Sequence, residues 1–404
     1  MAIQPTLALI PAAQGSKFYS VLPSNGVGDF DFSRASTATR VNSKGLIEEV
    51  ASGVSRLDYT GGGCPHHLLE PQSTNLLQYS EDFSNSYWIK QDSSILSNQA
   101  ISPDGTLNAS LYTTSSATFD FIETTSSFIV SGYSFSVFAK KGTSDKIDLS
   151  LSGTAFTDTR SVRFDLTNKT SETLAGILRS NIEDYGNGWM RCSIYAVTNA
   201  SGSGNVRLLS GSSDNVSTLY LWGAQLEQKS YASSNIPTNG SESTRLRDLS
   251  DTQNLSNVIG QTEGTIFYDA ILVRKSINTS EYLYELTISD GSTQNIFVID
   301  NYNNSLSIIM KNGGSIQFTN NSFNPTEGAR YRLGFAYKQN DFALYINGNQ
   351  IATDTSGTVP TMNQITFGNY YSNQTNLQNS VKVNDFKLYN TRLTNTELQA
   401  LTQV

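Results

Sequence analysis

The side chains of this chain that could carry out catalysis are few. Its two histidines, His66 and His67, stand directly after Cys64 and Pro65. A structural zinc site needs four ligands in established spacings, and this spacing is not one of them, so we interpret the pair as an exposed turn. A Ser-His-Asp hydrolase would need one of these histidines near a nucleophile elbow between a strand and a helix. No elbow of that kind is found, and we expect no such hydrolase.

Carboxyl pairs for glycoside hydrolysis are also poorly spaced. Glu281 and Glu285 lie on one face if their run is a strand, which places them about 13 Å apart. That exceeds the upper limit of about 9.5 Å for an inverting pair. Glu48 and Glu49 are adjacent and would point to opposite faces of a strand. We therefore expect no enzyme activity and keep a polysaccharide depolymerase as an alternative.

Sugar binding without catalysis requires fewer specific side chains than an active site does. Aromatic rings stack on the C–H faces of a pyranose, and amide groups bond its hydroxyls. Two polar, tyrosine-containing segments supply both kinds of group and are our candidate carbohydrate-binding residues: Asn369, Tyr370 and Tyr371 in one, and Asn301, Tyr302 and Asn303 in the other. The competing interpretation is that these are ordinary tyrosines near sheet edges, whose hydroxyls reach water.

The composition indicates the elements that must position these residues. Of the 404 residues, 15% are charged and 10% are aromatic. Few charges with many aromatics argue against a disordered chain and against a helical one, which leaves an all-β protein. The net charge of −8 gives no basic footprint for nucleic acid. No 18-residue apolar run and no basic leader are present, so we expect neither membrane insertion nor secretion by a signal peptide.

We expect two β-sandwich (jelly-roll) domains after a mostly irregular N-terminal attachment segment. The segment covers residues 1–75, the first sandwich residues 76–250 and the second residues 251–404. In residues 219–227, Tyr220, Trp222, Ala224 and Leu226 share one parity, which predicts one apolar strand face. Trp189 and Trp222 each lie in or beside an apolar strand pattern and are expected in the core.

Local signals mark two features of the second sandwich. Asn347-Gly348 between apolar alternations predicts a hairpin, because both residues readily take positive φ. Asn312-Gly313 is a weaker signal of the same kind. Thr394 and Glu397 form a capping-box pattern that predicts a short C-terminal helix.

The C-terminal third resembles the laminin-G-like or concanavalin A-like jelly roll. Three stretches carry this resemblance: residues 341–348 (DFALYING), residues 365–368 (ITFG) and residues 386–398 (FKLYNTRLTNTEL). Many members hold calcium, for which Asp269, Asp300 and Asp385 are the available acids. No D-x-D-x-D run occurs, and we expect no cofactor.

The preceding part resembles bacteriophage virion proteins, namely fibre, spike and capsid-decoration proteins with central modules similar to carbohydrate-binding β-sandwiches. The pieces that carry this are residues 32–39 (FSRASTAT), residues 68–77 (LLEPQSTNLL), residues 222–227 (WGAQLE) and residues 230–238 (SYASSNIPT). Ser73 departs from the pattern, because related sequences often carry Arg there.

This resemblance implies a protein made in the host cytoplasm and located on the surface of the phage particle. The N-terminal segment would bind other virion proteins, and the sandwiches would bind host-surface glycans weakly. A homotrimer would supply avidity. The alternative is a purely structural capsid or tail adaptor that binds no glycan.

Overall fold

The described part of the chain is built almost entirely from strands. The computed structural model describes residues 3–115, 120–211, 216–275, 282–370 and 379–404. In these ranges it contains 32 strands and one helix, α1 (Asn395–Thr402). The predicted all-β class with β-sandwich domains is confirmed. Within the described ranges, no helix has the length and apolar character needed to cross a bilayer.

The central domain is a sandwich of two six-stranded antiparallel sheets. One has the order β10-β11-β20-β13-β18-β17 and the other β16-β15-β14-β19-β12-β9. Apolar side chains from both sheets, such as Val137 and Leu149, form one buried core between them. The strands are β9 (Ile89–Gln91), β10 (Ser93–Ile101), β11 (Leu107–Thr114), β12 (Phe121–Phe128), β13 (Gly132–Lys141), β14 (Lys146–Gly153), β15 (Arg160–Asp165), β16 (Thr170–Ala175), β17 (Arg179–Asp184), β18 (Trp189–Val197), β19 (Gly202–Ser210) and β20 (Thr218–Glu227).

The C-terminal domain folds one long antiparallel sheet around a second core. Phe297, Phe335 and Phe386 lie in this core. Helix α1 packs on β28 and β29 and begins with the predicted capping box of Thr394 and Glu397. The strands are β22 (Leu249–Thr252), β23 (Glu263–Leu272), β24 (Tyr282–Ser289), β25 (Ile296–Tyr302), β26 (Ser305–Asn312), β27 (Ser315–Phe323), β28 (Arg330–Lys338), β29 (Asp341–Ile346), β30 (Asn349–Asp354), β31 (Gln364–Phe367) and β32 (Val381–Tyr389).

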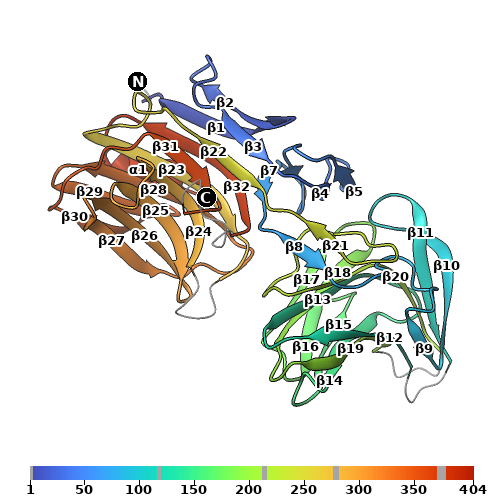
Figure 1. Cartoon of the computed structure of the whole chain (residues 1–404). Helices are drawn as coiled ribbons and strands as arrows, with labels where there is room; N and C mark the ends of the chain where they lie inside the picture. The colour runs from blue at the N-terminus through green and yellow to red at the C-terminus, as the bar shows by residue number, and fades with distance from the viewer. Residues whose placement is uncertain (1–2, 116–119, 212–215, 276–281, 371–378) are drawn as a thin grey trace.

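The N-terminal segment carries more strand than its sequence indicates. It orders by packing on its neighbours, because few of its residues can form a core alone. Strand β1 (Leu7–Gln14) pairs with β32, and β3 (Phe30–Ser33) pairs with β22. Strands β2 (Lys17–Leu22), β6 (Leu57–Asp58) and β7 (His66–Leu69) complete this extension of the C-terminal sheet. Figure 1 shows these blue strands lying along the red β32 and the yellow β22.

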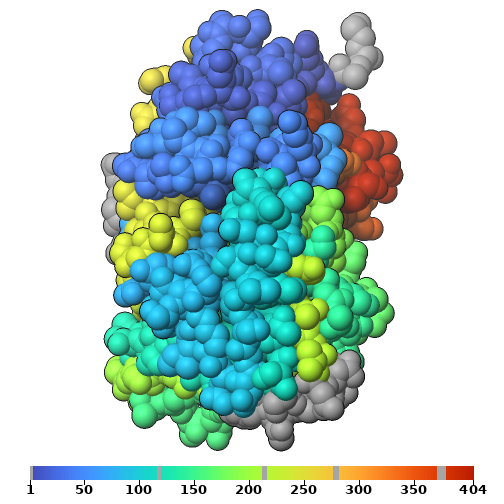
Figure 2. Space-filling model, turned by 90° about the vertical axis from the view of Figure 1, so that its right-hand side faces the viewer, coloured from blue at the N-terminus to red at the C-terminus, as the bar shows by residue number. Residues whose placement is uncertain are grey.

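A second part of the same segment covers the central domain. The hairpin of β4 (Ala38–Val41) and β5 (Ile47–Val50) places Val41 and Ile47 against Phe138, Trp189 and Trp222. Figure 2 shows the N-terminal residues in continuous contact with the central domain. Strand β8 (Ser73–Asn75) pairs with β21 (Ser243–Arg245) where the chain passes between the domains. The segment therefore ties the two sandwiches together.

One predicted strand face changes sides in the middle of β20. Gly223 has φ +63° and lies at a β-bulge opposite β13. An extra residue in one strand reverses the side to which later side chains point. Leu219, Leu221, Ala224 and Leu226 therefore face the central core, whereas Trp222 faces the N-terminal hairpin. The prediction that Tyr220, Trp222, Ala224 and Leu226 share one face is wrong for this reason, but Trp189 and Trp222 are buried as predicted.

Candidate functional site

Two of the predicted sugar-binding tyrosines lie in one row of four on the C-terminal domain. Tyr302 stacks on Tyr282 with ring centroids 4.4 Å apart, and Tyr370 stacks on Tyr284 at 4.6 Å. Tyr282 and Tyr284 are two residues apart on β24, so their side chains share a face, and their nearly parallel rings are 6.1 Å apart. Strands β24 and β25 and the end of β31 thus position the row, which runs Tyr302, Tyr282, Tyr284, Tyr370.

Tyr282 and Tyr284 were not among the sequence candidates. Their signal lies in the hairpin register, since Ser289 pairs with Ile296 at the turn and Tyr282 pairs with Tyr302 at the far end. A register irregularity between Tyr284 and Leu286 keeps Tyr284 opposite Asp300. Counting back from the turn Asp290-Gly291 without this irregularity would place Tyr302 opposite Leu283, so the sequence alone does not reveal the stack.

A buried carboxyl group lies under the tyrosine row. Asp300 shares the outer face of β25 with Tyr302 and Val298, and its Oδ1 makes no hydrogen bond to any described residue. Burial raises the pKa of Asp300 to about 7, although the Ser307 hydroxyl and the charge of Lys311 act in the opposite direction. Near neutral pH this group can therefore both donate and accept hydrogen bonds.

The asparagines of the two candidate segments do not lie in the tyrosine row. Asn301 and Asn369 are fully buried, and Asn369 Oδ1 accepts a hydrogen bond of 2.8 Å from the Tyr370 backbone N–H. Asn303 is exposed in the β25–β26 turn, where it and Asn304 both have positive φ. A two-residue turn of this type favours Asn for conformational reasons. Tyr371 lies outside the described residues.

The histidines are not in an exposed turn, and that prediction is wrong. His66 and His67 lie on β7, which is buried between β6 and β32. His66 Nε2 is 3.2 Å from Asp58 Oδ1, and His67 Nε2 is 3.1 Å from the Ile10 carbonyl. Burial lowers the pKa of His67 to about 3, so this ring stays neutral. Among the described residues, no group of three or more His, Cys, Asp or Glu side chains is arranged to hold a metal ion.

The acids considered for catalysis and calcium do not come together as one group. Glu285 is buried in the core, where its Oε2 accepts a 2.5 Å hydrogen bond from the Tyr331 hydroxyl. Glu281, its possible partner, lies outside the described residues. Asp269 and Asp385 face each other across β23 and β32, and Asp269 accepts hydrogen bonds of 2.6 Å from two nitrogens of Arg330. Asp300 lies on β25 in another part of the sheet.

The sequence pieces that carry the phage resemblance converge in one buried network of charges, which we call the polar junction. Arg56 donates to Asp248 and, at 2.7 Å, to Glu70. Glu70 also accepts from the backbone N–H of Ser234 at 2.8 Å. Ser73, where related sequences often carry Arg, donates its hydroxyl to Glu227. The charged members are Arg34, Arg56, Glu70, Glu227, Arg245 and Asp248, three of each sign and all buried. These motifs are therefore structural, joining the N-terminal segment, the end of the central domain and the linker.

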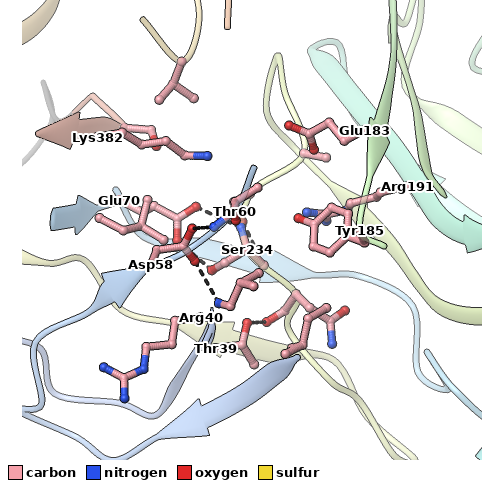
Figure 3. Close-up of a pocket in the computed structure, with 18 of the residues that line it drawn as sticks. Thr39, Arg40, Asp58, Thr60, Glu70, Glu183, Tyr185, Arg191, Ser234 and Lys382 are labelled. Atoms are coloured by element: carbon pink, nitrogen blue, oxygen red, sulfur yellow. Dashed lines mark hydrogen bonds between the residues drawn. The ribbon is translucent and has the colours of Figure 1, made fainter. Parts of the chain in front are cut away.

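A small cavity of about 70 Å³ lies beside the polar junction, where the N-terminal segment meets both domains (Figure 3). Lys382 of β32 and Glu183 of β17 point toward this space from opposite sides, and Tyr185 lies below Glu183. Asp58 accepts hydrogen bonds from the backbone N–H groups of Val41 and Thr60. Burial opposes ionisation of Asp58, but the His66 hydrogen bond and the Lys382 charge outweigh it and hold its pKa well below the usual range.

Comparison with known proteins identifies no family. No protein-family model and no curated protein sequence matches the chain. A Ruminococcus gnavus IT-sialidase CBM40 bound to α2,3-sialyllactose matches with a TM-score of 0.31 and 16% identity, covering 38% of this chain and 91% of that one. The botulinum neurotoxin serotype D binding domain matches with a TM-score of 0.32 and 11% identity, and the match covers 38% of this chain and 39% of that one. A third match is domain 4 of the arabinanase AbnA from Geobacillus stearothermophilus, in complex with arabinotriose. Its TM-score is 0.31 and its identity 9%, and the match covers 40% of this chain and 77% of that one. TM-scores and identities this low assign neither a ligand nor an activity to this chain.

Proposed function

We propose that this chain is a phage virion protein that displays its C-terminal sandwich for weak, multivalent and non-catalytic binding of host-surface glycans. The observation that carries the glycan part is the row of Tyr302, Tyr282, Tyr284 and Tyr370 on the face of one sheet. Tyr282 is 39% exposed, so the row reaches solvent. Tyr284 is buried and Tyr302 and Tyr370 are half-buried, so a ligand would meet the row mainly at Tyr282 and at the edges of its neighbours.

The row suits an extended saccharide better than a single sugar. Its inner ring faces cover one another, so it offers phenolic edges along its length and ring faces at its ends. Phenol hydroxyls donate and accept hydrogen bonds. Contacts of this kind are individually weak, which fits binding by many copies.

The virion part of the proposal is supported by the sequence resemblance and by the place of its motifs in the fold. Pieces that are far apart in the sequence meet in the polar junction, so the resemblance covers one coherent structural unit. The N-terminal segment also exposes a set of apolar side chains that would suit attachment to other virion proteins: Ile3, Ile10, Tyr19, Val21 and Val27. A homotrimer on the particle surface would supply the avidity.

The test uses the full chain, coupled in many copies to fluorescent particles and applied to an array of bacterial surface glycans. We expect binding to at least one glycan class, with no release of reducing ends from that glycan. An array without any signal would contradict the glycan part, and new reducing ends would establish the depolymerase alternative. Antibody-labelled electron microscopy of phage particles that encode the chain tests the virion part separately.

A further inference from the structure

A cleft of about 470 Å³, lined by both polar and apolar side chains, lies between the two domains. It shares Glu183, Tyr231, Val273 and Lys382 with the small cavity of Figure 3, so the two spaces adjoin. Its volume falls within the roughly 300–1,000 Å³ of small-molecule sites. An ion pair of 2.7 Å between Arg179 of the central domain and Glu327 of the C-terminal domain spans it. The cleft is therefore formed before any ligand arrives.

One wall of the cleft is the outer face of the central sheet. Arg179, Asn181 and Glu183 alternate along β17, so their side chains point the same way. They are paired in register with Tyr195, Ser193 and Arg191 of β18. Asn181 is exposed and lines the cleft. This wall carries a row of hydrogen-bonding groups, and Ile194 and Tyr195 add apolar surface beside them.

The opposite wall supplies positive charge. The Lys382 ammonium group forms no hydrogen bond or salt bridge with any residue that the structure describes, although its charge acts on the buried Asp58 carboxyl group. Arg274 lies over the Tyr231 ring at 5.2 Å and bonds the Ser230 hydroxyl at 2.7 Å. The Tyr231 hydroxyl is buried and has no partner within the described ranges. A buried polar atom of this kind calls for water or a ligand.

The charges of the lining select the ligand class. Arg179, Arg274 and Lys382 are positive and Glu183 and Glu327 negative, which gives +1 in a chain whose net charge is −8. A local positive excess attracts an anion, and the hydroxyl and amide groups suit a polyol. We propose that this interdomain cleft binds a carboxylated sugar, with its carboxylate on Lys382 and its hydroxyls on Asn181, Glu183 and Tyr231. This site is separate from the tyrosine row and can exist whether or not the row binds glycan.

The test is calorimetric titration of the full chain with D-glucuronate, D-glucose and inorganic phosphate. Glucuronate is expected to bind about tenfold more tightly than glucose, the size of one charge-assisted contact. Lys382→Met is expected to remove that difference. Asn181→Ala changes an exposed residue and should leave the fold intact. It is expected to weaken glucuronate binding several-fold.

Two control variants separate this proposal from others. Lys146→Met changes a half-buried lysine on β14, in the opposite sheet of the central domain, and is expected to leave glucuronate binding unchanged. Tyr282→Ala, which alters the tyrosine row, is also expected to leave it unchanged. Equal affinity for glucuronate and glucose, no heat with millimolar glucuronate, or wild-type affinity in Lys382→Met would overturn the proposal. Phosphate binding as tight as glucuronate would also overturn it, by showing a general anion site.

Discussion

Tyr282 and Tyr302 stack across the β24–β25 pair with their ring planes 13° apart, and the buried Asp300 lies two residues before Tyr302 on the same face of β25. Both residues occupy positions whose side chains point away from the core, so the stack is not needed to fill the sandwich. Offset stacking contributes about 0.5–1.5 kcal/mol beyond area burial. The two rings therefore hold each other in place and form a rigid surface, which lowers the entropic cost of binding a flexible chain.

Replacing these tyrosines should weaken glycan binding without unfolding the domain. For Tyr282→Ala we expect a loss of about 1 kcal/mol per site, roughly fivefold in affinity, measured in solution with a glycan that scores on the array. Tyr19→Ala is the matched control, because Tyr19 is also 39% exposed but lies on β2. Light scattering checks that all variants keep the same oligomeric state. Equal losses in both variants would remove the tyrosine row as the site.

The core carboxyl group of Glu285 should make stability depend on pH. Burial raises its pKa to about 7, against the hydrogen bond from Tyr331, whereas the unfolded chain has the ordinary value of 4.5. The folded state thus holds its proton more tightly, so stability falls as pH rises from about 4.5 to about 7 and is then level. The full effect is about 3 kcal/mol.

Glu285→Gln removes this titration while keeping a similar shape. The variant should gain stability relative to the parent at pH 8 and much less at pH 5, as measured by urea unfolding at both values. Asp300→Asn should change stability with pH in the same way, because burial also raises the pKa of Asp300 to about 7. If Glu285→Gln changed the free energy of unfolding by the same amount at pH 5 and at pH 8, Glu285 would be ionised in the core of the parent protein at both values.

Local signals in the sequence predicted what short-range physics decides. Asn347 and Gly348 both take positive φ in the β29–β30 turn, and Thr394 caps α1, as expected. These features depend on residues within a few positions of each other. The partners of β1 and β3 could not be read in the same way, because β32 and β22 lie hundreds of residues away in the chain.

The candidate site was predictable only in part, for a related reason. Tyr302 and Tyr370 stood out because polar, tyrosine-rich segments are visible in the sequence, whereas Tyr282 looks like any strand residue until its register is known. His66 and His67 were misplaced because their burial comes from β32, at the other end of the chain. Asn301 and Asn369 are polar residues that the fold buries, which composition alone does not indicate.

The polar junction should be far more sensitive to mutation than a surface ion pair. Arg56→Met leaves Glu70 and Asp248 buried with fewer positive partners, and breaking a buried pair typically costs about 3–5 kcal/mol. Arg40→Met is the control, because its 2.8 Å pair with Glu48 is partly exposed and should be worth about 0–1 kcal/mol. Thermal unfolding of both variants measures the difference. A loss in Arg56→Met no larger than in Arg40→Met would mean that the junction does not hold the three parts together.

The bulge at Gly223 should tolerate no side chain, and a second glycine allows the reasons to be separated. Gly223→Ala would place Cβ 2.9 Å from the Phe138 ring at φ +63°, whereas Gly313 has a similar φ of +56° and open space around it. Positive φ costs an alanine about 1–2 kcal/mol at either position. The crowding at Phe138 adds about 1–3 kcal/mol at Gly223 alone. Urea unfolding should therefore rank Gly223→Ala well below Gly313→Ala. Equal losses would mean that Phe138 and the Trp222 face are loosely packed, and that the N-terminal hairpin does not clamp the central domain as closely as its buried contacts indicate.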